Sequence, residues 1–327
     1  MNLRSDKREP DRRIQTVLGR IPPECLGVCQ THEHLFVKAG PATDAVPALL
    51  LDDYAKTLEE LFLFRSAGGA SLVDAQPVGS GRMADLQERV SLESGVNVVA
   101  STGFHRPFFY ADAHWIHSVP TDRLVRLFVE ELTEGMYLDG EAAWPTLRGT
   151  ARAGLIKTAA GPDGIQGRWA CLFEAAADAA RESATPVLVH TEEGRSGLEI
   201  VRFFSDRGVP PGQLILCHLD RIAGNAEVMA EVAATGAWLE LDTIGRFKAH
   251  SDEEEGDMIT SLIESGHGAN LLLGLDVTRA RMRAYGGDIG LDYLRKRFLP
   301  LLRKRGIPEA DLTRMMVENP AKALCMR

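Results

Sequence analysis

Six residues of types that can bind metal ions follow short apolar runs in this chain. They are His32, His34, Lys157, His190, His218 and Asp276. The apolar runs before them are 26–29, 153–156, 187–189, 214–217 and 271–275. Because the active site of a parallel β/α barrel is built at the C-terminal ends of its strands, this placement predicts one polar cluster at one mouth of a barrel. The sequence therefore predicts a metal-dependent enzyme.

Each of these residues has a simpler explanation when it is taken alone. Alternation along a strand is enough to place His32 and His34 on one face. A single strand-end histidine, such as His190 or His218, is more often hydrogen-bonded than bound to metal, and Asp276 is a good helix-capping residue type. No structural role is shared by four histidines and an aspartate at four strand ends. Their combination therefore favours metal binding.

Lys157 is the unusual member of this set. An ammonium group is repelled by divalent cations and has no lone pair to donate, so the lysine must lose its proton or be chemically modified to act as a ligand. Reaction of the neutral amine with carbon dioxide would give a carbamate, an anion whose two oxygens can bridge two metals. Two other roles stay open: the lysine could hold a substrate phosphate, or form a Schiff base.

Short apolar segments alternate with amphipathic segments along the chain. The apolar segments are expected to be strands that end near Cys29, Asp74, Ser101, Lys157, His190, His218, Leu241 and Asp276. The amphipathic segments are expected to be helices at 51–65, 83–93, 122–133, 170–182, 198–207, 226–234, 253–265 and 291–303. Eight repeats without a G-x-G-x-x-G turn favour an α/β fold of the (β/α)8 TIM-barrel class. A last helix at 309–317 should cross the N-terminal face of the barrel, and the aromatic loop 103–120 should overhang the site.

Length and composition agree with this fold. The chain has 327 residues, 45% of them hydrophobic, so we expect a single barrel domain over 1–327 with a loosely ordered lead-in at 1–13. The net charge of −9 argues against nucleic acid as a partner. Five scattered cysteines without a C-x-x-C pair argue against disulfides, and no stretch is apolar enough to cross a membrane. We therefore expect a cytoplasmic protein with no membrane partner, which could form a homodimer.

The order of the candidate ligands resembles that of the phosphotriesterase-like branch of the amidohydrolase superfamily. The similarity covers nearly the whole chain, from about residue 17 to residue 324, and its motifs are Thr-His-Glu-His-Leu at 31–35, Gly-Leu-Ile-Lys at 154–157, Val-His-Thr at 189–191 and Glu-Asn-Pro at 318–320. The resemblance implies a barrel of the amidohydrolase type with two divalent metals. The buried metal would be held by His32, His34, Asp276 and carbamylated Lys157. The exposed metal would be held by Lys157, His190 and His218.

This ligand set has chemical consequences. Neutral imidazoles and carboxylate-type oxygens suit zinc, with manganese, iron or cobalt as alternatives. A hydroxide that bridges two metals has a lowered pKa, and the metals polarise a carbonyl or phosphoryl oxygen, which is the chemistry of hydrolysis. We expect Asp276 to take the proton and later to give it to the leaving group. Asp220, two residues past His218, would face the same way on an extended chain and orient a ligand or relay the proton, or it could pair with Arg221 in a loop.

Basic residues follow the last two predicted strands of this acidic chain. They are Arg246, Lys248, Arg279, Arg281 and Arg283. Loops at this place in a barrel often bind phosphate, so we expect an anionic substrate, although a solvated helix face would explain the last two equally well. Relatives that act on phosphorylated sugar lactones hold the phosphate with a basic residue after strand seven, then an arginine and a tyrosine after strand eight. Arg246 or Lys248 and Arg279 match this pattern, but Met282 takes the tyrosine position, with Tyr285 three residues later.

These observations predict a metal-dependent hydrolase. The favoured activity is that of a lactonase or related carboxyl-ester hydrolase, which attacks a small anionic, sugar-derived lactone, with or without a phosphate, through a metal-bridging hydroxide. From the aromatic loop, His105 and Tyr110 are included in the substrate site. The same centre would serve a phosphotriesterase or an amide hydrolase. Different classes that stay open are a barrel that binds metal and ligand without turnover, and a Schiff-base lyase that uses Lys157.

Overall fold

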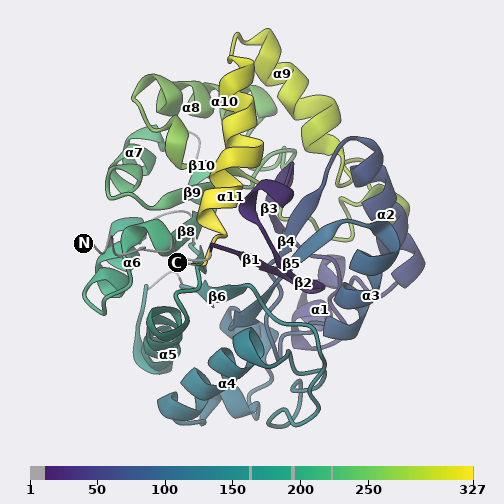
Figure 1. Ribbon diagram of the computed structural model, residues 1–327, viewed down its shortest axis with the longest axis vertical. Helices are drawn as coiled ribbons and strands as arrows, with labels where there is room; N and C mark the ends of the chain where they lie inside the picture. The colour runs from purple at the N-terminus through teal and green to yellow at the C-terminus, as the bar shows by residue number, and fades with distance from the viewer. Residues whose placement is uncertain (1–11, 162–163, 193–195, 222–223, 327) are drawn as a thin grey trace, which may run out of the picture.

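Eight parallel strands form one sheet that curls into a nearly closed barrel (Figure 1). The computed structural model describes residues 12–161, 164–192, 196–221 and 224–326. The barrel strands are β3 (Cys29–Glu33), β4 (Ser71–Asp74), β5 (Asn97–Gly103), β6 (Leu155–Ala159), β7 (Val187–His190), β8 (Leu214–Cys217), β9 (Trp238–Leu241) and β10 (Leu271–Leu273). Each pairs in parallel with its sequence neighbours, and nearly every strand residue is buried, as is typical of a sheet covered on both faces.

The first and last barrel strands are joined just beyond the end of β10. The backbone N–H groups of Asp276 and Leu275 donate to the carbonyl oxygen of His32, at 2.9 and 3.3 Å. The buried carboxylate of Glu33 accepts hydrogen bonds from the N–H groups of Leu275 and Val277, at 3.0 and 3.3 Å. These bonds fix the histidine-bearing end of β3 against the segment that carries Asp276.

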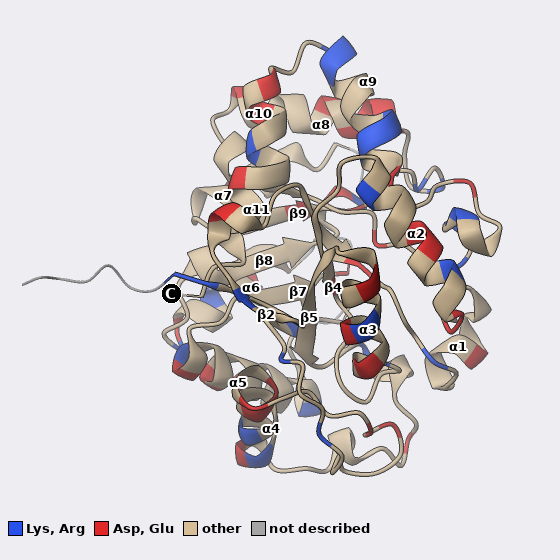
Figure 2. Ribbon diagram, turned by 45° about the vertical axis from the view of Figure 1, so that its right-hand side comes forward, with Lys and Arg blue, Asp and Glu red and all other residues tan. Residues whose placement is uncertain are grey.

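Helices surround the barrel, and charged residues are spread over them (Figure 2). They are α1 (Pro41–Ala45), α2 (Tyr54–Ser66), α3 (Ala84–Ser94), α4 (Thr121–Thr133), α5 (Gly167–Ser183), α6 (Gly197–Ser205), α7 (Ala226–Ala234), α8 (Asp252–Glu264), α9 (Leu299–Lys304), α10 (Glu309–Thr313) and α11 (Asn319–Ala323). Side-chain caps explain where two of these helices begin: Ser251 and Glu254 form a capping box at the N-terminus of α8, and Asp53 caps the N-terminus of α2. No helix of the described residues is long and apolar enough to span a membrane.

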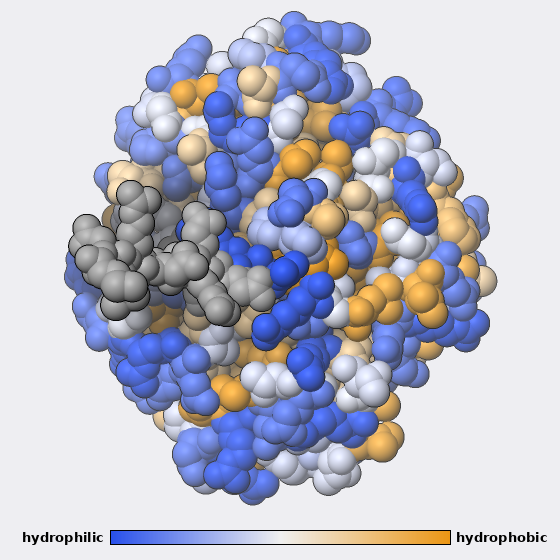
Figure 3. Space-filling view, in the orientation of Figure 1, coloured by the Kyte–Doolittle hydropathy of each residue, from blue (hydrophilic) through white to orange (hydrophobic). Residues whose placement is uncertain are grey.

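The N-terminal end of the barrel is closed by packing. The hairpin of β1 (Ile14–Thr16) and β2 (Gly19–Ile21) lies across this end together with α11 (Figure 1). Apolar side chains fill the barrel interior beneath them: Ile14, Leu26, Val73, Val99, Leu155, Leu188, Ile215, Leu272 and Leu324. Hydrophilic side chains predominate on this face of the molecule, with hydrophobic ones in small groups (Figure 3). The polar cluster predicted from the sequence lies at the opposite end of the barrel.

The predicted fold class is confirmed, and the differences lie at element boundaries. The eighth strand ends at Leu273 rather than near residue 276, because the chain turns toward β3 there. The last helical region, predicted at 309–317, continues through a π-helical turn to Ala323. The two π-helical turns, Leu294–Phe298 and Arg314–Glu318, each precede a proline, which cannot donate to the carbonyl four residues back.

Candidate metal centre

Four of the predicted ligands converge where the first, fourth and last barrel strands end. The Nε2 atom of His34 lies 3.2 Å from Oδ1 of Asp276, and Nε2 of His32 lies 3.9 Å from the same oxygen. Nζ of Lys157 lies 3.4 Å from Nε2 of His32. One ligand atom from each of His32, His34 and Asp276 falls within 4.8 Å of the other two. This spacing suits three ligands of one metal ion.

Lys157 is held inside the cluster by its surroundings. The side chain is fully buried, and among the ion pairs that the structure describes none involves it. A lysine without an anionic partner is unusual at a buried position, where an unpaired ammonium group is costly. The backbone has no room to shift: Gly103 has a φ of 100°, and a Cβ atom there would lie 2.0 Å from the carbonyl oxygen of Lys157.

His190 and His218 form the adjoining part of the cluster. Nε2 of His218 lies 2.8 Å from Nδ1 of His190, and the rings of His218 and His32 are 5.1 Å apart. Burial lowers the pKa of His32 and of His190 to about 4, and it lowers the pKa of His218 well below its ordinary value. The three imidazoles are therefore neutral at pH 7, which is the form that binds metals.

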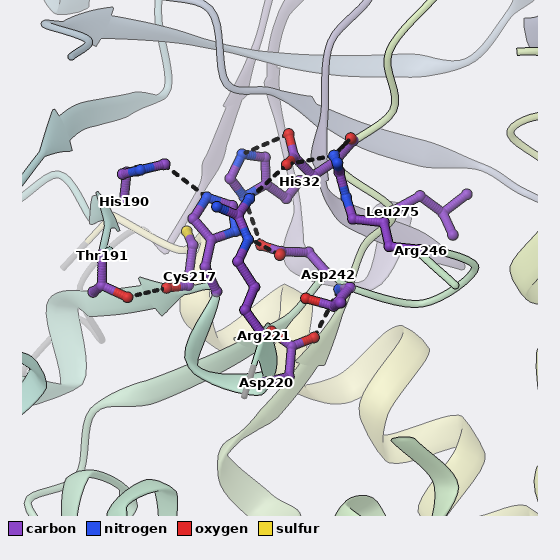
Figure 4. Close-up of polar contacts among 12 residues, drawn as sticks. His32, His190, Thr191, Cys217, Asp220, Arg221, Asp242, Arg246 and Leu275 are labelled. Carbon is purple, nitrogen blue, oxygen red and sulfur yellow. Dashed lines mark hydrogen bonds and ion pairs between the residues drawn. The ribbon is translucent and has the colours of Figure 1, made fainter. Parts of the chain in front are cut away.

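The carboxylate of Asp242 contacts the Nδ1 atoms of two of these histidines (Figure 4). Its carboxylate oxygens lie 3.1 Å from Nδ1 of His32 and 2.6 Å from Nδ1 of His218. A carboxylate on Nδ1 favours the proton there and leaves Nε2 free for a metal. Burial raises the pKa of Asp242, but the two histidines outweigh burial and hold it well below its usual range. The sequence prediction missed Asp242, although it directly follows the apolar strand β9, which is the signal that identified the other strand-end residues.

Two of the candidate ligands have strained backbones. His218 and Asp276 have φ angles of 66° and 46°, in the left-handed region that non-glycine residues seldom adopt. Such conformations cost on the order of 1–3 kcal/mol each and are concentrated at functional sites. Past His218 the chain enters a 3-10 helix, Leu219–Arg221, instead of continuing as an extended strand. This turn brings Arg221, rather than Asp220, to the cavity.

Asp220 lies behind the cluster. Its carboxylate accepts a 2.7 Å hydrogen bond from the backbone N–H of Thr243, which links the ends of β8 and β9. Burial, reinforced by the charge of Asp242, raises the pKa of Asp220 to about 7. It is not among the described residues that line the cavity. Its predicted role in proton relay stays a prediction, and its contacts are those of a residue that braces the strand ends.

The cavity at this end of the barrel combines metal-ligand residues, apolar side chains and arginines. The six candidate ligands line it together with Val37, Leu49, Leu51, Gln76, His105, Arg106, Phe108, Phe109, Arg221, Arg246, Val277 and Thr278. Two of the predicted substrate residues, Arg246 and His105, thus line this cavity. Tyr110 is buried, and its hydroxyl accepts a 2.7 Å hydrogen bond from the backbone N–H of His105, so it positions that residue.

Two predicted substrate residues lie elsewhere in the described structure. Arg279 lies 3.4 Å from the carboxylate of Asp52 and over the ring of Tyr285. The hydroxyl of Tyr285 is itself bonded to the carbonyl oxygen of Asp53 at 2.8 Å. Lys248 is exposed, and neither basic residue is among the described residues that line the cavity. The arrangement expected for a phosphate grip after the last strand is not formed by these side chains.

The other two arginines after β10, Arg281 and Arg283, make structural contacts around the site. Arg281 donates to the backbone carbonyl oxygens of Ile244 and Leu275, which ties together the segments after β9 and β10. Arg283 forms an ion pair with the buried carboxylate of Asp292. Both side chains thus have structural partners, and neither lines the described cavity.

Arg221 and Arg246 reach the candidate centre directly (Figure 4). Nη2 of Arg221 lies 3.0 Å and Nη2 of Arg246 lies 2.6 Å from Oδ2 of Asp276. Burial raises the pKa of Asp276, but Arg246 and the neighbouring histidines hold it well below its usual range. From the sequence, Arg221 was expected only as a possible partner of Asp220, since the chain after His218 was taken to be extended.

Comparison with known proteins agrees with this geometry. The model of the phosphotriesterase family matches residues 12–324. The chain belongs to the phosphotriesterase family. Within the family, a phospho-furanose lactonase of Mycoplasmopsis synoviae (strain 53) is 30% identical over 322 residues, which are 95% of this chain and 91% of that protein. Family membership identifies the chain as a hydrolase.

Solved structures give the same picture. An amidohydrolase from Mycoplasma synoviae superposes with a TM-score of 0.91 at 29% identity, over 98% of this chain and 93% of that one. A lactonase from Listeria monocytogenes superposes with a TM-score of 0.88 at 26% identity, over 96% of this chain and 99% of that one. The barrel described above is therefore the barrel of this family.

Proposed function

We propose that this phosphotriesterase-family hydrolase is a metal-dependent lactonase that acts on a small anionic lactone. The observation that carries the proposal is the buried cluster of His32, His34 and Asp276, whose carboxylate also faces two arginines. The relatives that are named as lactonases support an ester rather than a phosphotriester as the reacting group. A phosphotriesterase or an amide hydrolase would use the same donor set.

The residues fit two divalent metal ions. The buried ion would be held by His32, His34 and Asp276 and the exposed ion by His190 and His218, with carbamylated Lys157 between them. A carbamate would turn the buried cation of Lys157 into an anion that the metals neutralise, which accounts for a lysine buried beside His32 without an anionic partner in the described structure. Zinc suits these donors, as do manganese, iron and cobalt. When bound, the metals would supply a water of lowered pKa and polarise the carbonyl oxygen.

The chain's own groups then have distinct tasks in hydrolysis. Water adds to the carbonyl carbon, the ring C–O bond breaks, and the water proton passes to the ring oxygen. Asp276 lies beside the ligands and is the group that we propose carries this proton. Asp242 keeps His32 and His218 in one tautomer and orientation. Arg221 and Arg246 supply positive charge for the anionic group of the substrate.

Metal content and lactone hydrolysis test this function together. Protein from metal-supplemented medium should carry close to two divalent ions per chain, and chelation should abolish hydrolysis of a lactone panel. Lys157→Ala should lower metal content and activity together, and a short carboxylic acid should restore part of both. Lys248→Ala, which removes an exposed lysine outside the cavity, is the control. Full metal occupancy in Lys157→Met would overturn the bridging role, and borohydride trapping of substrate on Lys157 would indicate a lyase instead.

A further inference from the structure

We infer that Arg221 and Arg246 form an anion-binding pair directly beside the metal centre, so that the substrate carries its negative charge next to the scissile bond. The inference rests on the proposed lactonase function and specifies its substrates. The class it selects is a lactone with a carboxylate on the ring carbon bonded to the ring oxygen. Lactones whose anionic group lies several bonds away from the ester are not selected by this pair.

The two oxygens of Asp276 face in different directions. Oδ1 lies 3.2 Å from Nε2 of His34, on the side of the candidate ligands. Oδ2 lies 3.0 Å from Nη2 of Arg221 and 2.6 Å from Nη2 of Arg246. One carboxylate thus separates the two guanidinium groups from the metal ligands. An anion that reaches both arginines must therefore lie within a few bonds of the reacting carbonyl.

Both guanidinium groups keep donors for a further anion. A guanidinium carries five N–H donors, and the contacts with Asp276 use only the Nη2 atom of each arginine. Nε of Arg246 is buried and has no hydrogen-bond partner among the described residues. The Nη1 groups of both arginines make no contact with Asp276, and a bound carboxylate or phosphate oxygen can accept hydrogen bonds from such groups.

The ion pairs at the mouth also distinguish these two arginines from the third one. The third arginine of the cavity, Arg106, has a carboxylate of its own, because its Nη1 lies 2.5 Å from Oε1 of Glu192. Arg221 and Arg246 instead share the single carboxylate of Asp276 as their ion-pair partner in the described structure. If Asp276 coordinates a metal, the negative charge of its carboxylate is drawn toward the metal and away from the two arginines. Both guanidinium groups line the cavity, where a substrate anion can accept hydrogen bonds from them.

A grip for a distant anionic group is not formed by the described side chains. Arg279 is paired with Asp52, and Tyr285 is bonded to the start of α2. Both lie outside the described cavity lining. The cavity lining also includes apolar side chains such as Leu49, Leu51 and Phe109. These can pack against a lactone ring but cannot hold a charge.

Matched lactones test the position of the charge. The first is γ-butyrolactone with a carboxylate on the ring carbon next to the ring oxygen, and the second carries a neutral carboxamide at the same carbon. The third carries a phosphate on an exocyclic carbon. For the metal-loaded protein we expect kcat/KM for the carboxylate to exceed that for the carboxamide about 10- to 100-fold, the gain typical of charge-assisted hydrogen bonds. The phosphate-bearing lactone should show no comparable gain.

Single substitutions assign this preference to the pair. In Arg221→Met and in Arg246→Met the carboxylate-to-carboxamide ratio should fall about 10-fold or more. The ratio is the appropriate readout because both substrates see the same metal content, even if a substitution lowers that content. Arg207→Met is the matched control, since Arg207 is also partly buried and pairs with one carboxylate, that of Glu174, on the outer helices. It should leave the ratio unchanged.

A binding measurement separates this inference from the lactonase proposal. Tetrahydrofuran-2-carboxylate lacks the scissile carbonyl. Calorimetry should show that it binds the metal-loaded protein more tightly than tetrahydrofuran-2-carboxamide does. This difference in affinity should be lost in Arg221→Met. If this holds but no lactone is hydrolysed, the lactonase proposal fails and the anion pair stands. If lactones are hydrolysed but both arginine variants keep the wild-type ratio, or the exocyclic phosphate is preferred, the anion pair is overturned.

Discussion

The barrel contains two arginine–carboxylate clusters that are built in opposite ways. In the cluster between β5 and α4, Arg82 and Glu131 are fully buried and form two parallel hydrogen bonds, of 2.5 and 2.9 Å. The remaining bonds of Arg82 go to the carbonyl oxygens of Ser101 and Tyr137, both at 2.9 Å. Each charge thus has its own partner, and the cluster ties three segments of the fold together.

The cluster at the mouth of the barrel distributes its charges unevenly. Arg221 and Arg246 converge on the one carboxylate of Asp276, whose other oxygen faces the histidines. Lys157 is buried beside His32 without a carboxylate partner in the described structure. A buried charge with an oppositely charged partner of its own serves stability, whereas two cations that share one carboxylate at a cavity can also bind an anionic ligand.

Asp276 should show the largest functional effect in this comparison. Asp276→Asn keeps the shape of the side chain but removes its charge and its ability to accept a proton. Turnover should fall about 100- to 10,000-fold with little change in KM, as is typical of lost acid–base catalysis. Steady-state kinetics at saturating metal would measure this. Turnover within a few-fold of the wild type would mean that another group carries the proton.

Arg82 should show the largest effect on stability. Arg82→Met leaves the buried carboxylate of Glu131 without its partner, which typically costs about 3–5 kcal/mol in the free energy of unfolding. Urea unfolding would measure the loss, and the double variant Arg82→Met/Glu131→Leu should recover much of it. Arg221→Met is the comparison, because Asp276 keeps Arg246 as a partner when Arg221 is removed, so the loss should be smaller than at Arg82. Equal losses at the two arginines would contradict the distinction between the clusters.

The sequence predicted the parts of the site that depend on strand ends. All six candidate ligands follow apolar runs, and the barrel brings them together because parallel strands end at one face. Asp242 carried the same signal after β9 and was overlooked because it is not a member of the ligand set that the family resemblance implies. The position of Asp242 at the site could therefore have been predicted from the sequence.

The loops could not be predicted in the same way. Asp220 was placed toward the cavity by assuming two-residue periodicity, but the left-handed φ of His218 starts a 3-10 turn with a period of three. Arg221 therefore faces the mouth. Arg279 was expected at the site because it follows strand eight, yet its direction is set by distant partners, Asp52 and Tyr285, which no local pattern reveals. Loop side chains follow tertiary contacts rather than sequence period.

Asp242 should have an intermediate effect. Asp242→Asn keeps an acceptor oxygen for only one of the Nδ1–H groups of His32 and His218, and its NH2 group faces the other, so the contacts that set the two tautomers are lost in part. Loss of such a partner typically lowers metal affinity about 10- to 100-fold. Competition with a chelator of known affinity would measure it. Asp220→Asn is the control, because Asp220 bonds to a backbone N–H rather than to a candidate ligand, and it should change metal affinity much less.

Arg279 should show the smallest effect. Its partner Asp52 is 48% exposed and Arg279 itself 38%, so the pair is worth at most about 1 kcal/mol in the free energy of unfolding. Because Arg279 lies outside the described cavity lining, Arg279→Met should leave kcat/KM within about three-fold of wild type for charged and neutral lactones alike, a difference below about 1 kcal/mol. Measuring both substrates with Arg279→Met and Arg221→Met in parallel gives the contrast. A loss confined to the charged substrate in Arg279→Met would move the anion site from the pair beside Asp276 to the loop after β10.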